Sequence, residues 1–365
     1  MVLIVAVLTF LLAAGCAPRL VRPSDARIAV MGRVDRGDDS HWRVGYPGVT
    51  FRVLFQGSTL RLRAGCTTAA CRLDVSVDGV EPRVVRLSKG DSELALAEGL
   101  PAGAHTVEIV QRTEAWQGIL SVRGFVAPQG TILPAPAWPG RRLLFIGDSV
   151  TCGEAIDRNA GGDCVIKREP AAGENGGRSY GMLLARALSA QAHLVCYGGR
   201  GLIRDWRGRR DVANGPRIFD LAVADDRPRA FWDHAGYTPD VVVVSLGTND
   251  FNLDLGDFPA REEFVAAYVA LVRAIRAHYP AAAILLTEGA IVSDQQDDHR
   301  IPQRPQKTVL REYLAETARR LADPRVTVFP SQHYPGDACN PHPTREQHAA
   351  MARDLEPVIR RQAGW

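Results

Sequence analysis

The chain has 365 residues, of which 46% are hydrophobic, and a formal net charge of +3. This length favours two domains over one, and the apolar content is sufficient for a full core. The small net charge, with no long basic run and no nucleic-acid motif, argues against a nucleic acid or another polyanion as a partner.

The first fifteen residues, MVLIVAVLTFLLAAG, are almost wholly apolar and lead directly into Cys16. So short a span, ending in small residues, is typical of a secretion signal rather than of a membrane-spanning helix. The stretch LLAAGC also resembles a bacterial lipobox, which implies that the cysteine becomes a lipidated N-terminus. We therefore expect residues 1–24 to be a lipoprotein-type signal segment and tether. The exported protein would be lipid-anchored in the bacterial cell envelope, in the periplasm or at the outer membrane; ordinary secretion and a retained anchor are alternatives.

Residues 25–130 have the pattern of an antiparallel β-sandwich. Apolar and polar residues alternate, as in half-buried strands, in the segments VTFRVLF, STLRLRAG, CRLDVSVDG, PRVVRLS and AHTVEIVQRT. Asp78 and Gly79 predict a hairpin turn. The proline-rich residues 131–140 then predict a stiff linker between two domains.

The pattern changes over residues 141–365, where apolar runs alternate with helical stretches. The runs RRLLFIGD, AHLVCYGG, DVVVVSLGTND, AAILLTEGA and RVTVFPSQ predict buried parallel strands. Helices are expected over 179–190, 261–279, 306–323 and 344–361, the last with capping-box spacing from Thr344 to Gln347. This alternation predicts an α/β fold, with a doubly wound parallel sheet and flanking helices.

Four small or polar residues follow successive strands of this sheet. Ser149 follows the first strand, Gly199 the second and Asn249 the third, and His342 lies in the loop after the fifth. Ligand sites of open α/β sheets lie at the carboxyl ends of the strands, so we expect these residues to form one site. Taken singly, they could be a helix cap, a turn glycine, an Asx turn and a surface histidine.

Together, these four residue types fit acyl transfer. A serine hydroxyl becomes an effective nucleophile when a histidine within reach takes its proton. The backbone N–H groups of Ser149 and Gly199 and the side-chain amide of Asn249 would then stabilise the oxyanion. Such a mechanism needs no cofactor, and no Cys-x-x-Cys pair or Cys/His spacing indicates a metal site.

The segments GDSVTCGE, YGGRGL, SLGTND and NPHPTREQHAAMA resemble the sequence blocks of the SGNH, or GDSL-type, hydrolases, with Ser, Gly, Asn and His in the same order. The segments MGRV, LDVSVDG and GTILPAP are similar to the N-terminal jelly-roll domain of family-two carbohydrate esterases. The resemblance implies a jelly-roll sandwich followed by an SGNH catalytic domain over residues 141–365. It also implies a serine esterase that removes O-acetyl groups from xylan, glucomannan or derived oligosaccharides.

Two alternatives to this function stay open. One is an SGNH esterase that acts on peptidoglycan, another secreted glycan or small acyl esters. The other is a lipid-anchored carbohydrate-binding protein with a weak or vestigial site. For the favoured function we expect a monomer whose partner is an acetylated carbohydrate substrate, with membrane contact only through the N-terminal lipid anchor.

One position differs from the pattern of many SGNH enzymes, which carry an aspartate three residues before the histidine to orient its imidazole. Here that residue is Cys339, so we expect Asn340 or a backbone carbonyl to orient His342, with Asp337 as the less favoured alternative. A neutral partner stabilises the imidazolium less than a carboxylate does, which predicts modest turnover. His348 is expected to be a solvated or half-buried helical residue.

Aromatic rings supply the usual platforms for sugars, so Trp206 and Trp232, in loops of the catalytic half, are candidate substrate contacts. Core packing is the alternative role for each.

Export would place the cysteines in an oxidising environment. Cys66 and Cys71 are close enough in sequence for a hairpin disulfide. Outside the signal segment, the other cysteines are Cys152, Cys164, Cys196 and Cys339. These four allow three pairings. We favour Cys152–Cys339, because it would tie the loops of the nucleophile and the base together; Cys152–Cys164 and buried free thiols are the alternatives.

Overall fold

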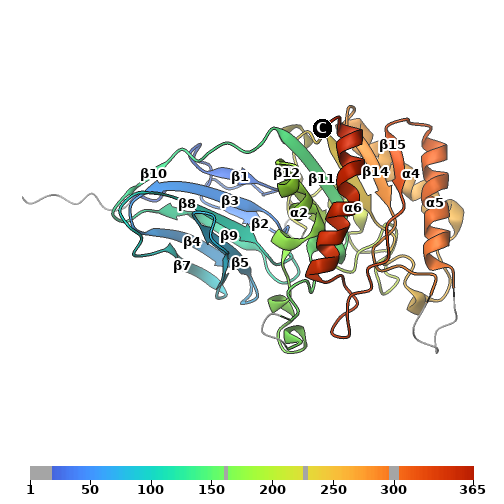
Figure 1. Ribbon diagram of the computed structural model, residues 1–365, viewed down its shortest axis with the longest axis horizontal. Coiled ribbons are helices and arrows are strands. Elements are labelled where there is room, and N and C mark those ends of the chain that lie inside the picture. Colours follow the sequence, from blue (N-terminus) through green and yellow to red (C-terminus); the bar gives the residue numbers. More distant parts are fainter. Residues whose placement is uncertain (1–18, 160–162, 225–228, 296–303) are drawn as a thin grey trace, which may run out of the picture.

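The computed structural model describes residues 19–159, 163–224, 229–295 and 304–365. The lipidation predicted at Cys16, and most of the predicted signal segment, lie outside these residues. A β-sandwich and a parallel α/β layer lie side by side along the longest axis of the molecule (Figure 1). None of the described helices is long and apolar enough to cross a membrane.

The sandwich consists of two antiparallel sheets. One has the strand order β1-β3-β8-β5-β6 with β10 beside β3, and the other has the order β2-β9-β4-β7. The strands are β1 Ala29–Met31, β2 Trp42–Val44, β3 Thr50–Gln56, β4 Leu60–Cys66, β5 Arg72–Val77, β6 Arg83–Arg86, β7 Gly90–Ala97, β8 Ala104–Gln111, β9 Leu120–Val126 and β10 Thr131–Leu133. In β3, Phe51, Val53 and Phe55 are buried whereas Arg52 and Leu54 are only partly so. This is the period-two alternation on which the prediction rests.

The predicted hairpin turn is present, whereas the predicted linker begins inside the sandwich. Asp78 and Gly79 have φ angles of 52° and 76°, as the central residues of a tight hairpin turn between β5 and β6 require. Residues 131–133, expected to open the linker, form β10 and pair antiparallel with β3. Thr-Ile-Leu is a strand-forming triplet, and β10 lies at the sheet edge, where the prolines after it are tolerated. The sandwich therefore continues to residue 133.

The second half is a five-stranded parallel sheet in the order β12-β11-β13-β14-β15, which confirms the predicted doubly wound class. The strands are β11 Arg141–Gly147, β12 Ala190–Cys196, β13 Val241–Ser245, β14 Ala283–Thr287 and β15 Val326–Phe329. The α-helices are α1 Ser149–Cys152, α2 Tyr180–Ala187, α3 Gly215–Phe219, α4 Arg261–His278, α5 Gln306–Leu321 and α6 Arg345–Ala363. Short 3₁₀ turns are η1 Val165–Lys167, η2 Pro170–Ala172, η3 Gly176–Arg178, η4 His234–Gly236 and η5 Leu253–Leu255.

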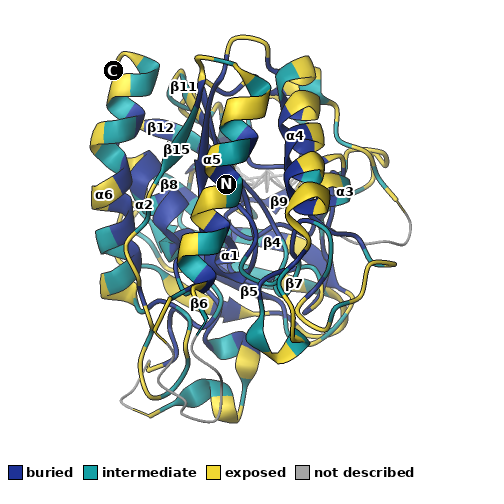
Figure 2. Cartoon of the chain, turned by 90° about the vertical axis from the view of Figure 1, so that its right-hand side faces the viewer, coloured by how far each residue is buried: buried dark blue, intermediate teal, exposed yellow. Residues whose placement is uncertain are grey.

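Helices cover both faces of the parallel sheet. α2 and α6 pack on the face that carries Leu143 and Phe145 of β11. α4 and α5 pack on the opposite face, which carries Leu144 and Ile146. The helices are buried toward the sheet and exposed on their outer sides (Figure 2). Such burial on both faces explains why the strands are continuous apolar runs in the sequence rather than alternating ones.

Helix α6 begins at the predicted capping box. The Thr344 side chain accepts a hydrogen bond from the Gln347 backbone N–H, and the Gln347 side chain accepts one from the Thr344 backbone N–H. His348, in the first turn, is fully buried, so the expectation of a solvated or half-buried residue is wrong. Its Nδ1 accepts a hydrogen bond from the Tyr180 backbone N–H at 3.1 Å, which ties α6 to the start of α2.

The sandwich and the α/β layer share one apolar core, which runs from the strands of the sandwich to one face of the parallel sheet. Buried polar contacts cross the same junction. Arg33 donates to the carbonyls of Phe219 and Leu221 at 2.5 and 3.1 Å, and the Tyr46 hydroxyl donates to the carbonyl of Ile218 at 2.9 Å. Separation of the sandwich from the α/β layer would expose this apolar surface and leave these polar groups without partners. The two halves therefore form one structural unit.

Two residues that follow β8 extend the junction toward the carboxyl edge of the parallel sheet. Arg112 is buried and donates to the carboxylates of Asp74 at 2.6 Å and Asp157 at 2.7 Å. Glu114 is also buried, and its Oε2 accepts a hydrogen bond from the Gly198 backbone N–H at 2.6 Å. Burial raises the pKa of Glu114 from its ordinary 4.5 to about 8. A sandwich residue thus holds the loop that follows β12.

We expect the raised pKa of Glu114 to make the protein less stable as the pH rises. The folded state holds this proton more tightly than the unfolded chain, so the contribution is present below pH 4.5 and is lost through about pH 8. Glu114→Gln retains an acceptor for Gly198 and removes the titration. The melting temperature, measured from about pH 5 to 9, should therefore fall less steeply in this variant than in the wild type. Equal slopes would contradict the assignment, and the exposed Glu312→Gln serves as the control.

Candidate active site

The loops that carry the predicted site residues leave the sheet side by side. Gly147, at the end of β11, is in register with Cys196 of β12 and Ser245 of β13. With this strand order the direction of winding reverses between β11 and β13, the topological switch point at which open α/β sheets bind ligands. Ser149 follows β11 and Asn249 follows β13, so the predicted site lies at this switch point.

A tight turn places Ser149 at the first position of α1. The Asp148 carboxylate caps this short helix by accepting a hydrogen bond from the Val150 backbone N–H at 3.0 Å. The first N–H groups of a helix have no partner within it, so that of Ser149 is available to a ligand. A Cβ at Gly147 would collide with Thr151, which explains the glycine. Burial raises the pKa of Asp148 to about 7.

The imidazole of His342 lies between Ser149 and Asn340. Its Nε2 is 2.8 Å from the Ser149 Oγ, and its Nδ1 is 2.7 Å from the Asn340 Oδ1. An amide oxygen can only accept, so Nδ1 carries the proton and Nε2 is left free to take one from the serine. Burial lowers the pKa of His342, which keeps the ring neutral and able to act as a base. The structure therefore has Asn340, one of the expected partners, in the orienting position.

Asp337 does not contact the imidazole. Its Oδ1 accepts the backbone N–H groups of Cys339 at 2.9 Å and Asn340 at 3.2 Å, and it forms an ion pair with Arg158 at 3.3 Å. This carboxylate therefore shapes the loop that carries the histidine rather than the histidine itself.

Arg158, in the loop after α1, holds the histidine loop through its backbone. The guanidinium is almost fully buried and donates to the carbonyls of Asn340, His342 and Pro343. Its Nε donates to the Ala155 carbonyl at 2.8 Å, which fixes the side chain to its own loop. The nucleophile loop and the histidine loop are thus joined by one side chain.

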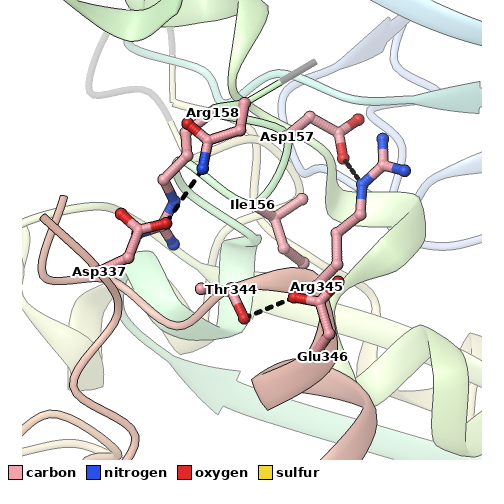
Figure 3. A pocket seen from close by; sticks show the side chains of 8 residues that line it. Ile156, Asp157, Arg158, Asp337, Thr344, Arg345 and Glu346 are labelled. Atoms are coloured by element: carbon pink, nitrogen blue, oxygen red, sulfur yellow. Dashed lines mark hydrogen bonds and ion pairs between the residues drawn. The ribbon is translucent and has the colours of Figure 1, made fainter. Parts of the chain in front are cut away.

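A cavity of about 390 Å³ lies beside Arg158 and Asp337 (Figure 3). Its walls are mostly charged or polar and include the Arg158–Asp337 pair and the Asp157–Arg345 ion pair, which measures 2.6 Å. Neither Ser149 nor its imidazole partner lines it, so this cavity is separate from the reacting atoms.

Two loops support the predicted oxyanion donors. The Asn249 Nδ2 donates to the carbonyl of Arg200 at 2.9 Å, which orients the amide and leaves its second N–H free for a ligand. The neighbouring Asp250 is fully buried and accepts the backbone N–H groups of Leu202, Ile203 and Arg204 at 2.7 to 3.1 Å. These contacts hold the loop that contains Gly199 against the loop after β13.

Gly199 needs to be a glycine for two reasons. Its φ of 73° is in the left-handed region, and a Cβ would lie 2.5 Å from the indole of Trp206. The Trp206 backbone N–H also donates to the Gly199 carbonyl at 2.9 Å. The indole is 47% exposed, with Arg207 over its ring at 4.5 Å, so it borders the site and keeps an accessible surface.

Trp232 is placed differently. Its ring packs against the buried guanidinium of Arg33, 5.1 Å away, and edge-on against His193 of β12. These contacts belong to the junction with the sandwich. They support core packing, the alternative role, rather than contact with a substrate.

The disulfides differ from the favoured pairing. Cys66–Cys71 is present as predicted, but the other bridges are Cys152–Cys196 and Cys164–Cys339. The predicted Cys152–Cys339 bridge is wrong, and so is the alternative Cys152–Cys164. Cys152 ends α1, which packs against β12, and Cys196 is the last residue of that strand. The histidine loop is tied instead to Cys164, in the long segment between α1 and α2.

One group of potential metal ligands occurs among the residues that the structure describes, and it consists of Asp220, His234 and His278. The two imidazoles are stacked, with ring centroids 3.8 Å apart and planes 16° from parallel. In-plane lone pairs of stacked rings do not converge on one ion, so this arrangement does not fit a metal site without rearrangement. The Nδ1 of His234 also forms a hydrogen bond with the hydroxyl of Tyr279 at 2.8 Å.

Several residues that build the site were not found from the sequence. They are Glu114, Arg158, Asp250 and Glu154, whose Oε2 lies 3.7 Å from the His342 Nε2. Asp250 adjoins Asn249, and Glu154 is the last residue of the block GDSVTCGE. Their positions next to predicted site residues could therefore have marked them as candidates. Arg158 and Glu114 act on backbone groups that are distant in sequence, and no local pattern marks such contacts.

Comparison with known proteins agrees with this architecture. Residues 30–136 match the family model described as "Carbohydrate esterase 2 N-terminal", and residues 145–357 match the "GDSL-like Lipase/Acylhydrolase family". The chain is 39% identical over 345 residues to an acetylxylan esterase / glucomannan deacetylase of Cellvibrio japonicus, covering 94% of this chain and 91% of the relative.

Solved structures show the same similarity. A family two carbohydrate esterase from Cellvibrio japonicus superimposes with a TM-score of 0.87 at 39% identity, covering 96% of this chain and 99% of that one. A family two carbohydrate esterase from Clostridium thermocellum, in complex with cellohexaose, gives a TM-score of 0.78 at 28% identity, with 93% and 99% covered.

The contact between Ser149 and His342 predicts that both side chains are essential to ester hydrolysis. Ser149→Ala and His342→Ala should each lower the turnover of a small acetyl ester by at least ~10³. Circular dichroism and the melting temperature should stay close to wild-type values, because neither change removes a core side chain. Near-normal turnover in either folded variant would rule out the assignment.

Asn340 offers a sharper test, because its side chain can be converted to the carboxylate that the loop lacks. Asn340→Ala removes the acceptor for Nδ1 and should lower kcat, by less than the roughly 10⁴-fold loss seen when an orienting carboxylate is replaced, because the amide carries no charge. Asn340→Asp retains the acceptor and adds a negative charge, which raises the pKa of His342. The acid limb of the kcat/KM profile should therefore move to higher pH in Asn340→Asp. An unmoved limb would show that residue 340 does not govern the imidazole.

Proposed function

Because the chain belongs to family two of the carbohydrate esterases, within the GDSL-like hydrolases, we propose that it is a serine esterase that removes O-acetyl groups from plant polysaccharides. The observation that carries the proposal is the 2.8 Å contact between the Ser149 hydroxyl and the His342 Nε2 at the carboxyl edge of the sheet. Acetylated xylan, acetylated glucomannan and their oligosaccharides are the proposed substrates.

In the first half of the reaction, the Ser149 Oγ attacks the acetyl carbonyl carbon while Nε2 of His342 takes the hydroxyl proton. The carbonyl π electrons move to the oxygen, and the resulting oxyanion is stabilised by the N–H groups of Ser149 and Gly199 and by the Asn249 amide. The tetrahedral intermediate then collapses, and His342 returns its proton to the sugar oxygen that leaves. The acetyl group remains on Ser149.

In the second half, His342 takes a proton from water, whose oxygen attacks the acetyl-serine carbonyl. Collapse of this second intermediate releases acetate and returns the proton to Ser149. Both halves need the same orientation of the imidazole, and Asn340 supplies it from the Nδ1 side. None of these steps requires a cofactor or a metal.

The exposed indole of Trp206 supports contact with a sugar ring. It packs on Gly199, one of the proposed oxyanion donors, so a ring resting on its face would lie beside the reacting acetyl group. Trp206 is therefore the aromatic side chain that we propose as a substrate contact.

Export forms part of the same proposal. Three disulfides in the described residues favour an oxidising compartment. We propose that the apolar segment before Cys16 directs export and that lipidation of this cysteine anchors the enzyme in the cell envelope. The monomeric state expected from the sequence is proposed in the same way.

Acetate release from acetylated xylan, acetylated glucomannan and O-acetylated peptidoglycan, measured side by side, tests the substrate. We expect release from the two plant polysaccharides at rates at least ~10³ above those of Ser149→Ala. Preference for peptidoglycan would assign the enzyme to another glycan. Binding of oligosaccharides without acetate release would indicate a carbohydrate-binding protein with a vestigial site.

A further inference from the structure

We propose that Glu154 is the carboxylate that stabilises the protonated imidazole of His342, and that it approaches from the nucleophile loop rather than from the histidine loop. The proposal rests on the serine esterase function argued above. It assigns a positioning role to a residue outside the hydrogen-bonded series of Ser149, His342 and Asn340. The Glu154 Oε2 lies 3.7 Å from the His342 Nε2, on the side of the ring that faces the serine.

The structure places Glu154 firmly. Its backbone N–H donates to the Ser149 carbonyl at 3.0 Å, so the residue is fixed to the nucleophile's own turn. The preceding Gly153 ends α1 with a φ of 81°, and a Cβ there would lie 2.5 Å from the carbonyl of Asn175. Only glycine fits this turn, which directs the next side chain back toward His342. The Glu154 side chain is 27% exposed, so a charge on it remains partly solvated.

A carboxylate in this position favours the reaction rather than the resting state. Before reaction, Nε2 presents a lone pair, which a nearby negative charge does not stabilise. Once the proton of Ser149 has moved to Nε2, the ring is positive and the same charge attracts it. The interaction is therefore stronger in the transition state than in the ground state, which is the condition for lowering a barrier. Asn340 is neutral and cannot supply this charge–charge attraction from the Nδ1 side.

The acids around the imidazole differ in how far they are buried. Burial raises the pKa of Glu114 to about 8 and that of Glu174 well above its ordinary value. Burial also raises the pKa of Asp148 to about 7, so it disfavours the charged form of all three acids, whereas the Glu154 side chain is partly exposed. The titratable groups that face Glu154 and His342 are Glu114, Glu174, Asp148, Arg158 and His348. The positive charge of Arg158 lowers the pKa of His342, whereas Glu154 raises it.

The test compares Glu154→Gln, which removes the charge at nearly constant shape, with Glu154→Asp, which keeps it. Hydrolysis of 4-nitrophenyl acetate by the full chain gives kcat, KM and the pH profile of kcat/KM. In Glu154→Gln we expect kcat to fall about tenfold with KM unchanged, less than the roughly 10²–10⁴-fold loss of a group that itself transfers the proton. The acid limb should move to lower pH by about 0.5 to 1 pH unit, because His342 loses an attractive anion.

Glu154→Asp should keep the acid limb close to the wild-type position, and Glu312→Gln should match the wild type throughout. A merely structural role for Glu154 would lower activity without moving the limb. An unmoved limb in a folded Glu154→Gln, or a shift to higher pH, would overturn the proposal.

A titration of the His342 imidazole by NMR separates this proposal from the proposed function. The signal is assigned by its loss in His342→Ala and followed against pH in wild type and in Glu154→Gln, without substrate. A lower pKa in Glu154→Gln supports the role of Glu154 even if the enzyme hydrolyses no acetyl ester. Equal pKa values overturn it even if the esterase function is confirmed.

Discussion

The site depends on the buried guanidinium of Arg158. Serine–histidine catalysis needs the two side chains within hydrogen-bond distance, yet Ser149 follows β11 whereas His342 lies beyond β15, at the far edge of the sheet. Arg158 spans this separation by donating to three carbonyls of the histidine loop. Since a guanidinium presents five donors in a fixed plane, it can hold three carbonyls at once, as the single ammonium of a lysine could not with the same geometry. The Cys164–Cys339 bridge reinforces the same connection covalently.

The sandwich takes part in this construction and is not an independent appendage. Arg112 reaches from β8 to Asp157, the neighbour of Arg158, and Glu114 accepts the N–H of Gly198, the neighbour of Gly199. Both contacts are buried, where a lost partner would leave a polar group unsatisfied. The loops that carry the proposed oxyanion donor and the proposed base are therefore shaped from two sides, by the parallel sheet and by the sandwich. This accounts for a shared apolar core between units that the sequence presents as two domains.

Features that arise from local pattern could be predicted from the sequence. Residues that follow parallel strands lie close together, because the carboxyl ends of these strands share one edge of the sheet. Ser149 and His342 could therefore be predicted as site residues from the sequence. Features that depend on contacts between distant segments could not be predicted. Pairing of Cys152 with Cys196 requires knowing that β12 lies next to β11, which the order of runs along the chain does not fix. Strand β10 was not predicted, because the prolines that follow it favour a linker. The roles of Glu114 and Arg158 required the fold itself.

The same reasoning explains how a site without an orienting carboxylate can retain its chemistry. In the pattern of many SGNH enzymes, an aspartate both fixes the tautomer and stabilises the positive ring. Here Asn340 fixes the tautomer through Nδ1, while the nearest carboxylate in its loop, Asp337, is engaged by Arg158 and two backbone N–H groups. A charge supplied from the nucleophile loop would then separate the two tasks. Orientation would come from the histidine loop and charge from Glu154, and each could change in evolution without loss of the other.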